Sequence, residues 1–259
     1  MITYYKITAD RKVEAVEDSE EAVWIHLEDP DVEEMEGVAG RLHFPLDYLD
    51  SALDPDEVSR FEHPDQDAPD GPILISLLFP CEADDAADTC VYINRTLSIT
   101  SLNDKLVTCV RSTPAFLKAI LDNRYQLILQ PHSVRDLIFE LAWQITRCSV
   151  LVIREVTEEM DLLQERLRHS TKTHNLLRLA DLDKTIIYLS TAVSENKPIL
   201  HQIPKLGSLV TSPEERAWLH DVLVETHQAD CMANQTKQML ERMDTTFSAI
   251  IQNNLNEIM

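Results

Sequence analysis

The chain has 259 residues, 44% of them hydrophobic, and a formal net charge of -22. This length and apolar content predict a folded globular protein, and no stretch approaches the roughly 18 apolar residues that a membrane span requires. The charge is uneven, because residues 1–90 hold 25 acidic side chains against 5 basic ones. Such an acidic first third argues against nucleic acid as a partner and suits cations or basic partners, although solubility alone can also explain it.

The first 130 residues alternate short strands and helices, which predicts an α/β domain. Runs of β-branched and aromatic residues predict strands at 2–7, 22–28, 71–79, 90–100 and 105–111. The segment "GPILISLLF" is apolar throughout, as expected of a central strand covered on both faces. Acidic first turns and capping residues predict helices at 29–44, 45–55 and 113–124. In the last of these, Thr113 is placed to cap and Pro114 to occupy the first helical position.

Residues 131–211 predict two long antiparallel helices and a connector. Apolar positions step by threes and fours from about 133 to 171 without Gly or Pro, which indicates one face of a helix. The second helix is expected to begin near Asn175 and to stop at Pro198.

Residues 212–259 predict one very long helix. Ser212 as N-cap, Pro213 at the first position and Glu215 form a capping box, and no Gly, Pro or basic last turn closes the helix before the chain ends. Along it, spacings of three and four define a heptad seam with a small and partly hydroxyl-bearing middle. We expect the preceding helices to cover one side of this helix and copies of the chain to cover the other, which predicts an oligomer. The seam residues are Leu219, Val222, Thr226, Ala229, Ala233, Thr236, Leu240, Met243, Phe247 and Ile250.

A small acidic α/β domain, two long antiparallel helices and a very long last helix together resemble the cytoplasmic part of CorA-type magnesium transporters. The stretches "LDPDEVSRFEHPD" and "LADLDKTIIYLSTAVSENKPIL" are similar to a strand entry and the second long helix of that family. Asn256 and Met259 of "NEIM" match the start of its pore gate. The family's Gly-Met-Asn triplet and both membrane spans would lie beyond Met259, so the resemblance implies a piece cut before the first span. Its place would be the cytoplasmic face of the inner membrane.

The resemblance also implies a homopentamer that transports Mg²⁺ or Co²⁺ and senses the ion between subunits. Mg²⁺ keeps most of its water, so one or two carboxylates are enough to hold it. In the family, one sensor acid lies high on the long helix, and counting back from Asn256 places it at Asp221. The partner acid of the neighbouring subunit should follow the apolar strand, at Glu82, with Asp84 and Asp85 as alternatives in register.

Three other interpretations stay open. A zinc-transporting member of the same superfamily would share this architecture, and a coiled-coil scaffold without an ion role would form an oligomer indifferent to chelators. A metal-dependent hydrolase would need a carboxylate-lined cleft within one subunit. The pair His220-Asp221 could belong to such a site, but further His and Asp ligands at suitable spacing are not evident in the sequence. No nucleotide-binding loop or nucleophile elbow is present either, so we do not expect an enzyme.

Histidine and cysteine residues give weaker signals. His220 and His227 lie seven residues apart on one helix face and could hold a transition metal, although such pairs are more often solvated or packed. The five cysteines lack C-x-x-C spacing, which favours reduced thiols in the core over disulfides or a zinc cluster.

Overall fold

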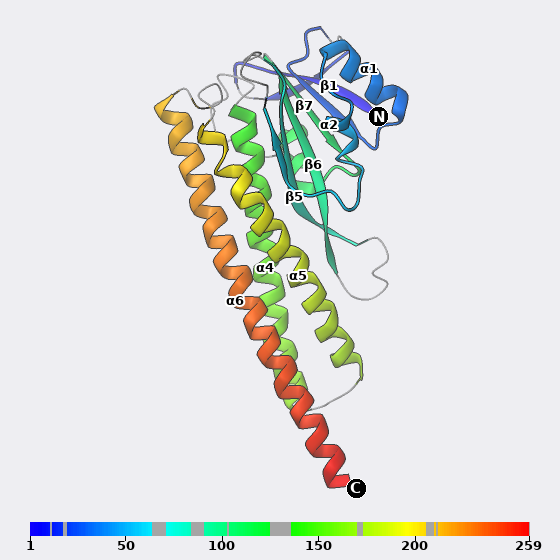
Figure 1. The fold of residues 1–259 in the computed structure, drawn as a ribbon, viewed down its shortest axis with the longest axis vertical. Coiled ribbons are helices and arrows are strands. Elements are labelled where there is room, and N and C mark those ends of the chain that lie inside the picture. The colour runs from blue at the N-terminus through cyan, green and yellow to red at the C-terminus, as the bar shows by residue number, and fades with distance from the viewer. Residues whose placement is uncertain are drawn as a thin grey trace.

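The computed structural model shows a seven-stranded mixed sheet followed by a bundle of three long helices (Figure 1). It describes residues 1–10, 12–17, 20–63, 71–83, 91–102, 104–124, 136–169, 173–205, 210 and 212–258, without the side chains at 168–169, 205, 250–251 and 253–258. The N-terminus lies in the sheet, and the C-terminus lies at the far end of the bundle. The predicted α/β domain followed by long antiparallel helices and a stalk helix is confirmed.

Strand order in the sheet is β2-β1-β3-β7-β6-β5-β4, and every neighbouring pair is antiparallel except β3 and β7. The bounds are β1 (Ile2–Ile7), β2 (Val13–Val16), β3 (Trp24–Glu28), β4 (Arg60–Glu62), β5 (Ile73–Glu82), β6 (Tyr92–Leu102) and β7 (Lys105–Val110). The apolar strand β5 is buried over its first eight residues, so both of its faces are covered as predicted. It is not central, however, because only the short edge strand β4 lies beyond it. The sequence did not reveal β2 and β4, which are too short for an alternation to stand out.

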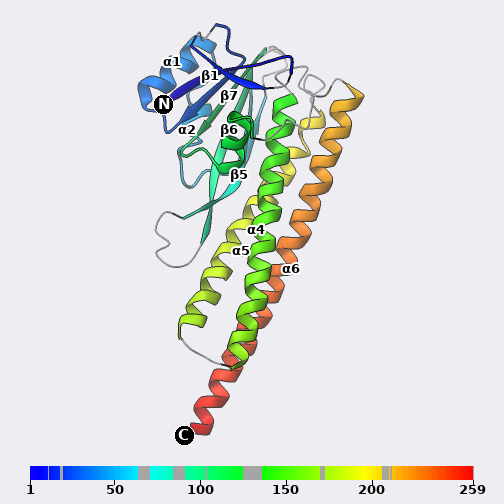
Figure 2. The same ribbon diagram turned by 180° about the vertical axis from the view of Figure 1, so that it is seen from behind.

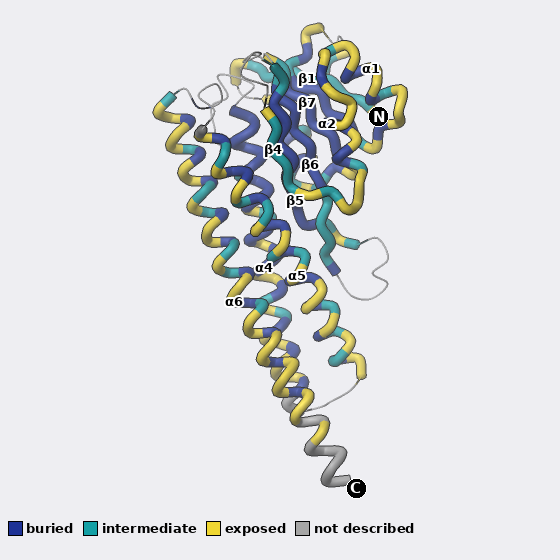
Figure 3. Tube along the Cα trace, in the orientation of Figure 1, coloured by how far each residue is buried: buried dark blue, intermediate teal, exposed yellow. Residues whose placement is uncertain are grey.

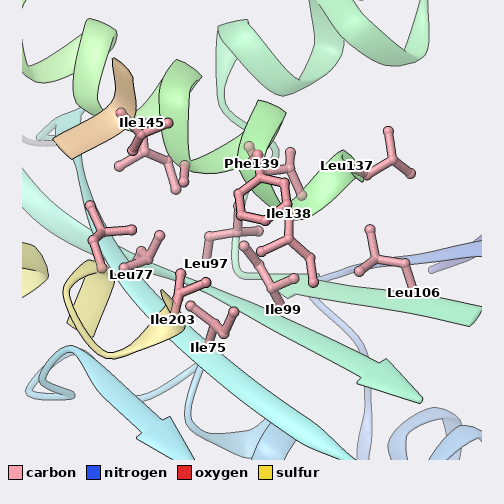
Figure 4. Close-up of a cluster of buried hydrophobic side chains, with 14 of the residues drawn as sticks. Ile75, Leu77, Leu97, Ile99, Leu106, Leu137, Ile138, Phe139, Ile145 and Ile203 are labelled. Atoms are coloured by element: carbon pink, nitrogen blue, oxygen red, sulfur yellow. The ribbon is translucent and has the colours of Figure 1, made fainter. Parts of the chain in front are cut away.

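Alternate residues of the strands enter two separate cores, as the two-residue period of a strand requires. One face packs Ile25, Leu27 and Leu74 against helices α1 (Val32–Leu42) and α2 (Asp47–Asp50). The opposite face packs against the start of helix α4 (Asp136–His169), where Phe139 lies among strand residues (Figure 4). The strand residues labelled in that close-up are Ile75, Leu77, Leu97, Ile99 and Leu106.

The start of helix α3 (Ala115–Leu121) differs from the prediction. Pro114 is the N-cap residue with an extended backbone, not the first helical residue, and no side-chain hydrogen bond caps the helix. Thr113 does not cap the helix, because it contacts β3 instead. Its N–H donates to Glu28 Oε1 at 2.8 Å, and its hydroxyl lies 2.9 Å from His26 Nε2. These contacts hold the residue at the end of β3, where it cannot reach the helix terminus.

Three helices form the bundle: α4, α5 (Thr173–Leu200) and α6 (Pro213–Ile258), with the short 3₁₀ helix η1 (Ile203–Lys205) in the connector. Helices α4 and α5 contact β5, and α6 packs mainly on α4 and α5. The 46 residues of α6 make a rod of about 70 Å. It continues past the end of α4 in both views (Figures 1 and 2).

The two predicted helix ends in this region had different outcomes. The capping box of α6 is present, because Glu215 N–H donates to Ser212 Oγ at 3.0 Å and Ser212 N–H donates to Glu215 Oε2 at 2.8 Å. The predicted stop at Pro198 is wrong, since α5 continues through it to Leu200. A proline there removes one helical hydrogen bond. Burial of Ile199 and Leu200 in the core offsets that cost.

The predicted seam of α6 faces the other helices of its own chain. Each seam residue from Leu219 to Phe247 is buried, and the side turned away from α4 and α5 is exposed (Figure 3). Small side chains let α4 and α6 approach closely enough for their threonines to pair. The hydroxyls of Thr146 and Thr226 lie 3.3 Å apart, and those of Thr157 and Thr236 lie 2.9 Å apart. Contact between copies, if made by α6, must therefore use the outward face.

Asn196 of α5 attaches the bundle to the sheet. Strand β4 pairs only with residues 74–76 of β5, so the backbone of Leu78 lies beyond its reach. The Asn196 amide replaces the missing strand: Oδ1 accepts from Leu78 N–H at 2.9 Å, and Nδ2 donates to Leu78 O at 2.8 Å. Ser59 Oγ also donates to Asn196 Oδ1 at 2.7 Å. Buried backbone groups need such partners, which makes this contact a structural joint.

Candidate functional site

Asp221 lies on the outward face of α6, near the start of the helix. Its neighbours Leu219 and Val222 are buried against the rest of the chain, whereas Asp221 itself is exposed. Within the described residues its carboxylate has no hydrogen bond and no ion pair. A carboxylate in this state is available to a cation or to another molecule.

Asp230, nine residues further along α6, is used differently. It lies where α6 meets α5, and its Oδ2 is 2.6 Å from Lys197 Nζ. Both side chains are partly buried, at 34% exposure for the lysine and 22% for the aspartate. This ion pair neutralises Asp230 within the chain, so of these two acids only Asp221 is left for an external ligand.

Glu82 is the last residue of β5 and is exposed. Its carboxylate has no hydrogen bond or ion pair to any residue that the structure describes. The alternatives Asp84 and Asp85 lie outside the described residues, as does Met259. Asn256 belongs to the last turns of α6, but its side chain is outside the described part.

Within the described part of the chain, Asp221 and Glu82 do not belong to a cluster of metal ligands. Among the described residues no group of three or more His, Cys, Asp or Glu side chains could hold a metal ion. Helices α4 and α5 contact β5, whereas Asp221 is exposed on α6 between the buried residues Leu219 and Val222.

Three groups in or near the interior have strongly shifted pKa values. Burial lowers the pKa of His26 to about 4, and burial raises the pKa of Cys109 to about 12 and that of Cys148 to about 11. The ring of His26 is held between Thr108 and Thr113, each 2.9 Å away. His26 and Cys109 are therefore neutral parts of the packing.

The prediction of thiols in the core is wrong for Cys231, which is exposed, whereas Cys109 is buried and Cys81 and Cys148 are half-buried. Cys90 lies outside the described residues.

Two contacts of α6 escaped the sequence analysis. The Lys197–Asp230 ion pair joins two helices. Its residues are 33 positions apart, so no local sequence pattern predicts the contact. His227 and Cys231 are one turn apart, and Cys231 Sγ lies 3.8 Å from His227 Nε2. The four-residue spacing does signal a shared helix face, but the prediction paired His227 with His220 instead.

None of the helices, searched over the described residues, contains a segment apolar and long enough to span a bilayer.

Comparison with known proteins gives one family and one fold. Residues 19–259 match the family model described as CorA-like Mg2+ transporter protein. A cobalt/magnesium transport protein CorA of Methanocaldococcus jannaschii is 23% identical over 229 residues, which cover 87% of this chain and 69% of that protein.

Two solved structures share the fold. The complete structure of the CorA magnesium transporter from Methanocaldococcus jannaschii has a TM-score of 0.82 at 18% identity, covering all of this chain and 80% of that chain. The ZntB cytoplasmic domain from Vibrio parahaemolyticus has a TM-score of 0.68 at 14% identity, covering 98% of each chain. Since the family model spans nearly the whole sequence, the chain belongs to the family of CorA-like Mg²⁺ transporter proteins, a family of transporters rather than enzymes.

Proposed function

We propose that this chain is the cytoplasmic regulatory domain of a divalent cation transporter, in which Mg²⁺ bound between copies controls the pore. The bridging ligands would be Asp221 of one copy and Glu82 of the next, with Asp84 and Asp85 as alternatives. Membership of a magnesium transporter family supports the choice of ion. The observation that carries the site is that the Asp221 carboxylate is exposed and has no partner among the described residues of its own chain.

The charge of the first domain supports a cation as the ligand. Most of the net charge of -22 comes from residues 1–90, which form the part of the molecule that contains β5. An acidic surface raises the local concentration of cations. Mg²⁺ needs only one or two carboxylates and retains water at its other positions, so two facing acids suffice.

Repulsion between facing carboxylates provides the switch. Two unit charges 4 Å apart near a protein surface repel by about 4 kcal/mol, and a divalent cation between them converts that repulsion into attraction. Bound Mg²⁺ would favour a symmetric ring of five copies, and loss of the ion would let the copies separate. This is a shift between two populations driven by a difference in cation affinity.

The pore itself would begin at the far end of α6. In a ring with parallel stalk helices, Asn256 and Met259 of the five copies would surround the axis. Asn256 would place a ring of amides at the pore mouth, where a hydrated cation can be received. The domain would then lie on the cytoplasmic face of the membrane.

Light scattering during a Mg²⁺ titration tests this proposal. The molar mass of the wild-type chain, 29.6 kDa for one copy, should rise towards that of a ring as Mg²⁺ is added and fall again with EDTA. Asp221→Asn should need at least about tenfold more Mg²⁺, because one of few protein ligands is lost. The matched control is Asp244→Asn, an exposed aspartate lower on the same helix, which should follow the wild type.

Two outcomes would contradict the proposal. The molar mass could stay that of a single copy at every Mg²⁺ concentration, which would remove the ring. Alternatively, Asp221→Asn could respond to Mg²⁺ as the wild type does, which would remove this site. An assembly indifferent to chelator would instead favour the scaffold interpretation.

The identity of the ion is tested separately. Thermal unfolding in Mg²⁺, Co²⁺ and Zn²⁺ at equal concentration ranks the affinities, because a ligand that binds only the folded state stabilises it more as the ratio of its concentration to its dissociation constant rises. We expect Mg²⁺ and Co²⁺ to stabilise the wild type more than they stabilise Asp221→Asn. Stabilisation by Zn²⁺ alone, lost in Asp221→Asn, would favour a zinc transporter.

A further inference from the structure

The outward face of α6 carries a second group of potential ligands. His227 and Cys231 are both exposed, and Cys231 Sγ lies 3.8 Å from His227 Nε2. The four-residue spacing on a helix places the two side chains on one face, the same spacing that lets paired histidines of metalloprotease helices hold zinc. Within the described residues, His227 has no other side-chain partner.

The separation of the two atoms fits a single metal ion. Zinc binds cysteine sulfur at about 2.3 Å and histidine nitrogen at about 2.0–2.1 Å, so a tetrahedral angle places the two ligand atoms about 3.6 Å apart. The observed 3.8 Å is within the range that a small rotation of either side chain covers. The two potential ligand atoms therefore already lie close to the separation that a single ion requires.

We propose that His227 and Cys231 form a two-ligand site for a thiophilic divalent cation such as Zn²⁺ or Co²⁺, with water in the remaining positions. Thiolate and imidazole are the ligands that zinc and cobalt prefer, whereas Mg²⁺ prefers oxygen. The thiol releases its proton on binding, so the sulfur–metal bond forms as the S–H bond is lost to solvent. This site does not rest on the sensor proposed above, because it uses other residues.

The other pair that the sequence suggested, His220 and His227, is too widely spaced along the helix to bind one ion. His220 and His227 are two helical turns apart, about 10 Å along the axis, which is too far for two nitrogens to share one ion. His220 therefore serves as a matched control, being an exposed histidine on the same helix. Cys148 is the matched thiol control, since it is half-buried and burial raises its pKa to about 11.

Absorption spectroscopy with Co²⁺ tests the site. Titration of the full chain with Co²⁺ in a thiol-free reductant should produce a sulfur-to-cobalt charge-transfer band that Zn²⁺ displaces and excess Mg²⁺ does not. Cys231→Ser should abolish the band. His227→Ala should weaken Co²⁺ binding by at least about tenfold, the smallest loss seen when even an outer partner of a metal ligand is removed.

The controls separate this site from other thiols and from misfolding. His220→Ala and Cys148→Ser should leave both the band and the affinity unchanged. Thermal unfolding in EDTA should be the same for His227→Ala, Cys231→Ser and the wild type, because both side chains are exposed. A band that survives Cys231→Ser, or one whose affinity is unaffected by His227→Ala, would overturn the proposal, as would the absence of any band.

Discussion

Three buried polar residues of the helix bundle find partners within the chain, whereas the exposed Asp221 of α6 does not find one in the part of the chain that the structure describes. Inside, Thr226 and Thr236 meet threonines of α4, and Asn196 meets the backbone of Leu78. Outside, Asp221 has no partner among the described residues, although Asp230 on the same helix is paired with Lys197. Groups satisfied within the chain specify the fold, and those left unsatisfied are available to ligands.

The largest expected change in the free energy of unfolding comes from a substitution on the buried face of α6, and the adjacent exposed residue provides the control. Leu240 is 1% exposed and Met239 is 44% exposed. Leu240→Ala should lower the free energy of unfolding by about 2–5 kcal/mol, because it leaves a cavity between the helices. Met239→Ala should change it by no more than about 0.5 kcal/mol. Urea denaturation measures both, and equal losses at the two positions would mean that α6 does not pack as described.

Acid should weaken the interior through His26. Its pKa of about 4 in the folded state lies below the value of about 6.5 expected when unfolded, so the unfolded chain binds the proton more readily. This contribution is fully present above pH 6.5 and is lost as the pH falls towards 4, by about 3 kcal/mol in total.

Urea denaturation at pH 7 and at pH 4.5 checks this prediction. His26→Gln should be less stable than the wild type at pH 7, because the ring fills a buried space between two threonines. It should lose less stability on acidification than the wild type does. If the two proteins lose the same amount, His26 is not the group that responds to acid.

Removing Asn196 should loosen the joint between sheet and bundle. Asn196→Ala leaves the N–H and C=O of Leu78 without their partner, which should cost about 1–3 kcal/mol. Hydrogen exchange should show faster exchange of the Leu78 amide before global unfolding. The control Asn234→Ala removes an exposed amide that bonds only within α6, and it should have little effect.

The smallest effects distinguish the two aspartates of α6. Lys197→Met should lower the free energy of unfolding by about 0.5–1 kcal/mol, as for other partly exposed ion pairs. Asp221→Asn, measured in EDTA, should change it by less than about 0.5 kcal/mol. A large loss at Asp221 in the absence of metal would indicate a structural role within the chain, contrary to the sensor proposal.

Much of the fold follows from local patterns in the sequence. Helical periodicity and the Ser212–Glu215 capping box define the long helices, and the continuous apolar run of β5 indicates its burial on both faces. The two helix ends that were predicted wrongly depend on tertiary contacts. Pro198 stays inside α5 because its neighbours are buried in the core, and Thr113 leaves its cap for a contact with Glu28.

The candidate site was less accessible to sequence reasoning. Asp221 came from a family resemblance, and the structure adds that it is exposed and has no partner among the described residues. The contact of His227 with Cys231 has a local spacing, but so do many helical pairs that bind nothing, and only the 3.8 Å separation selects it. The periodicity of α6 predicts an apolar face but does not say what covers it. The seam could therefore have packed against helices of the same chain or against other copies of the chain.

Mixing two variants that each fail to assemble in Mg²⁺ tests most directly whether a cation bridges neighbouring copies. One chain carries Asp221→Asn, and the other carries Glu82→Gln, Asp84→Asn and Asp85→Asn, which covers all three partner acids. Each alone should fail to assemble in Mg²⁺. In a 1:1 mixture about one interface in four joins an intact Asp221 to intact partner acids, so the account predicts partial recovery of Mg²⁺-dependent molar mass. A mixture as unresponsive as each variant alone would contradict it.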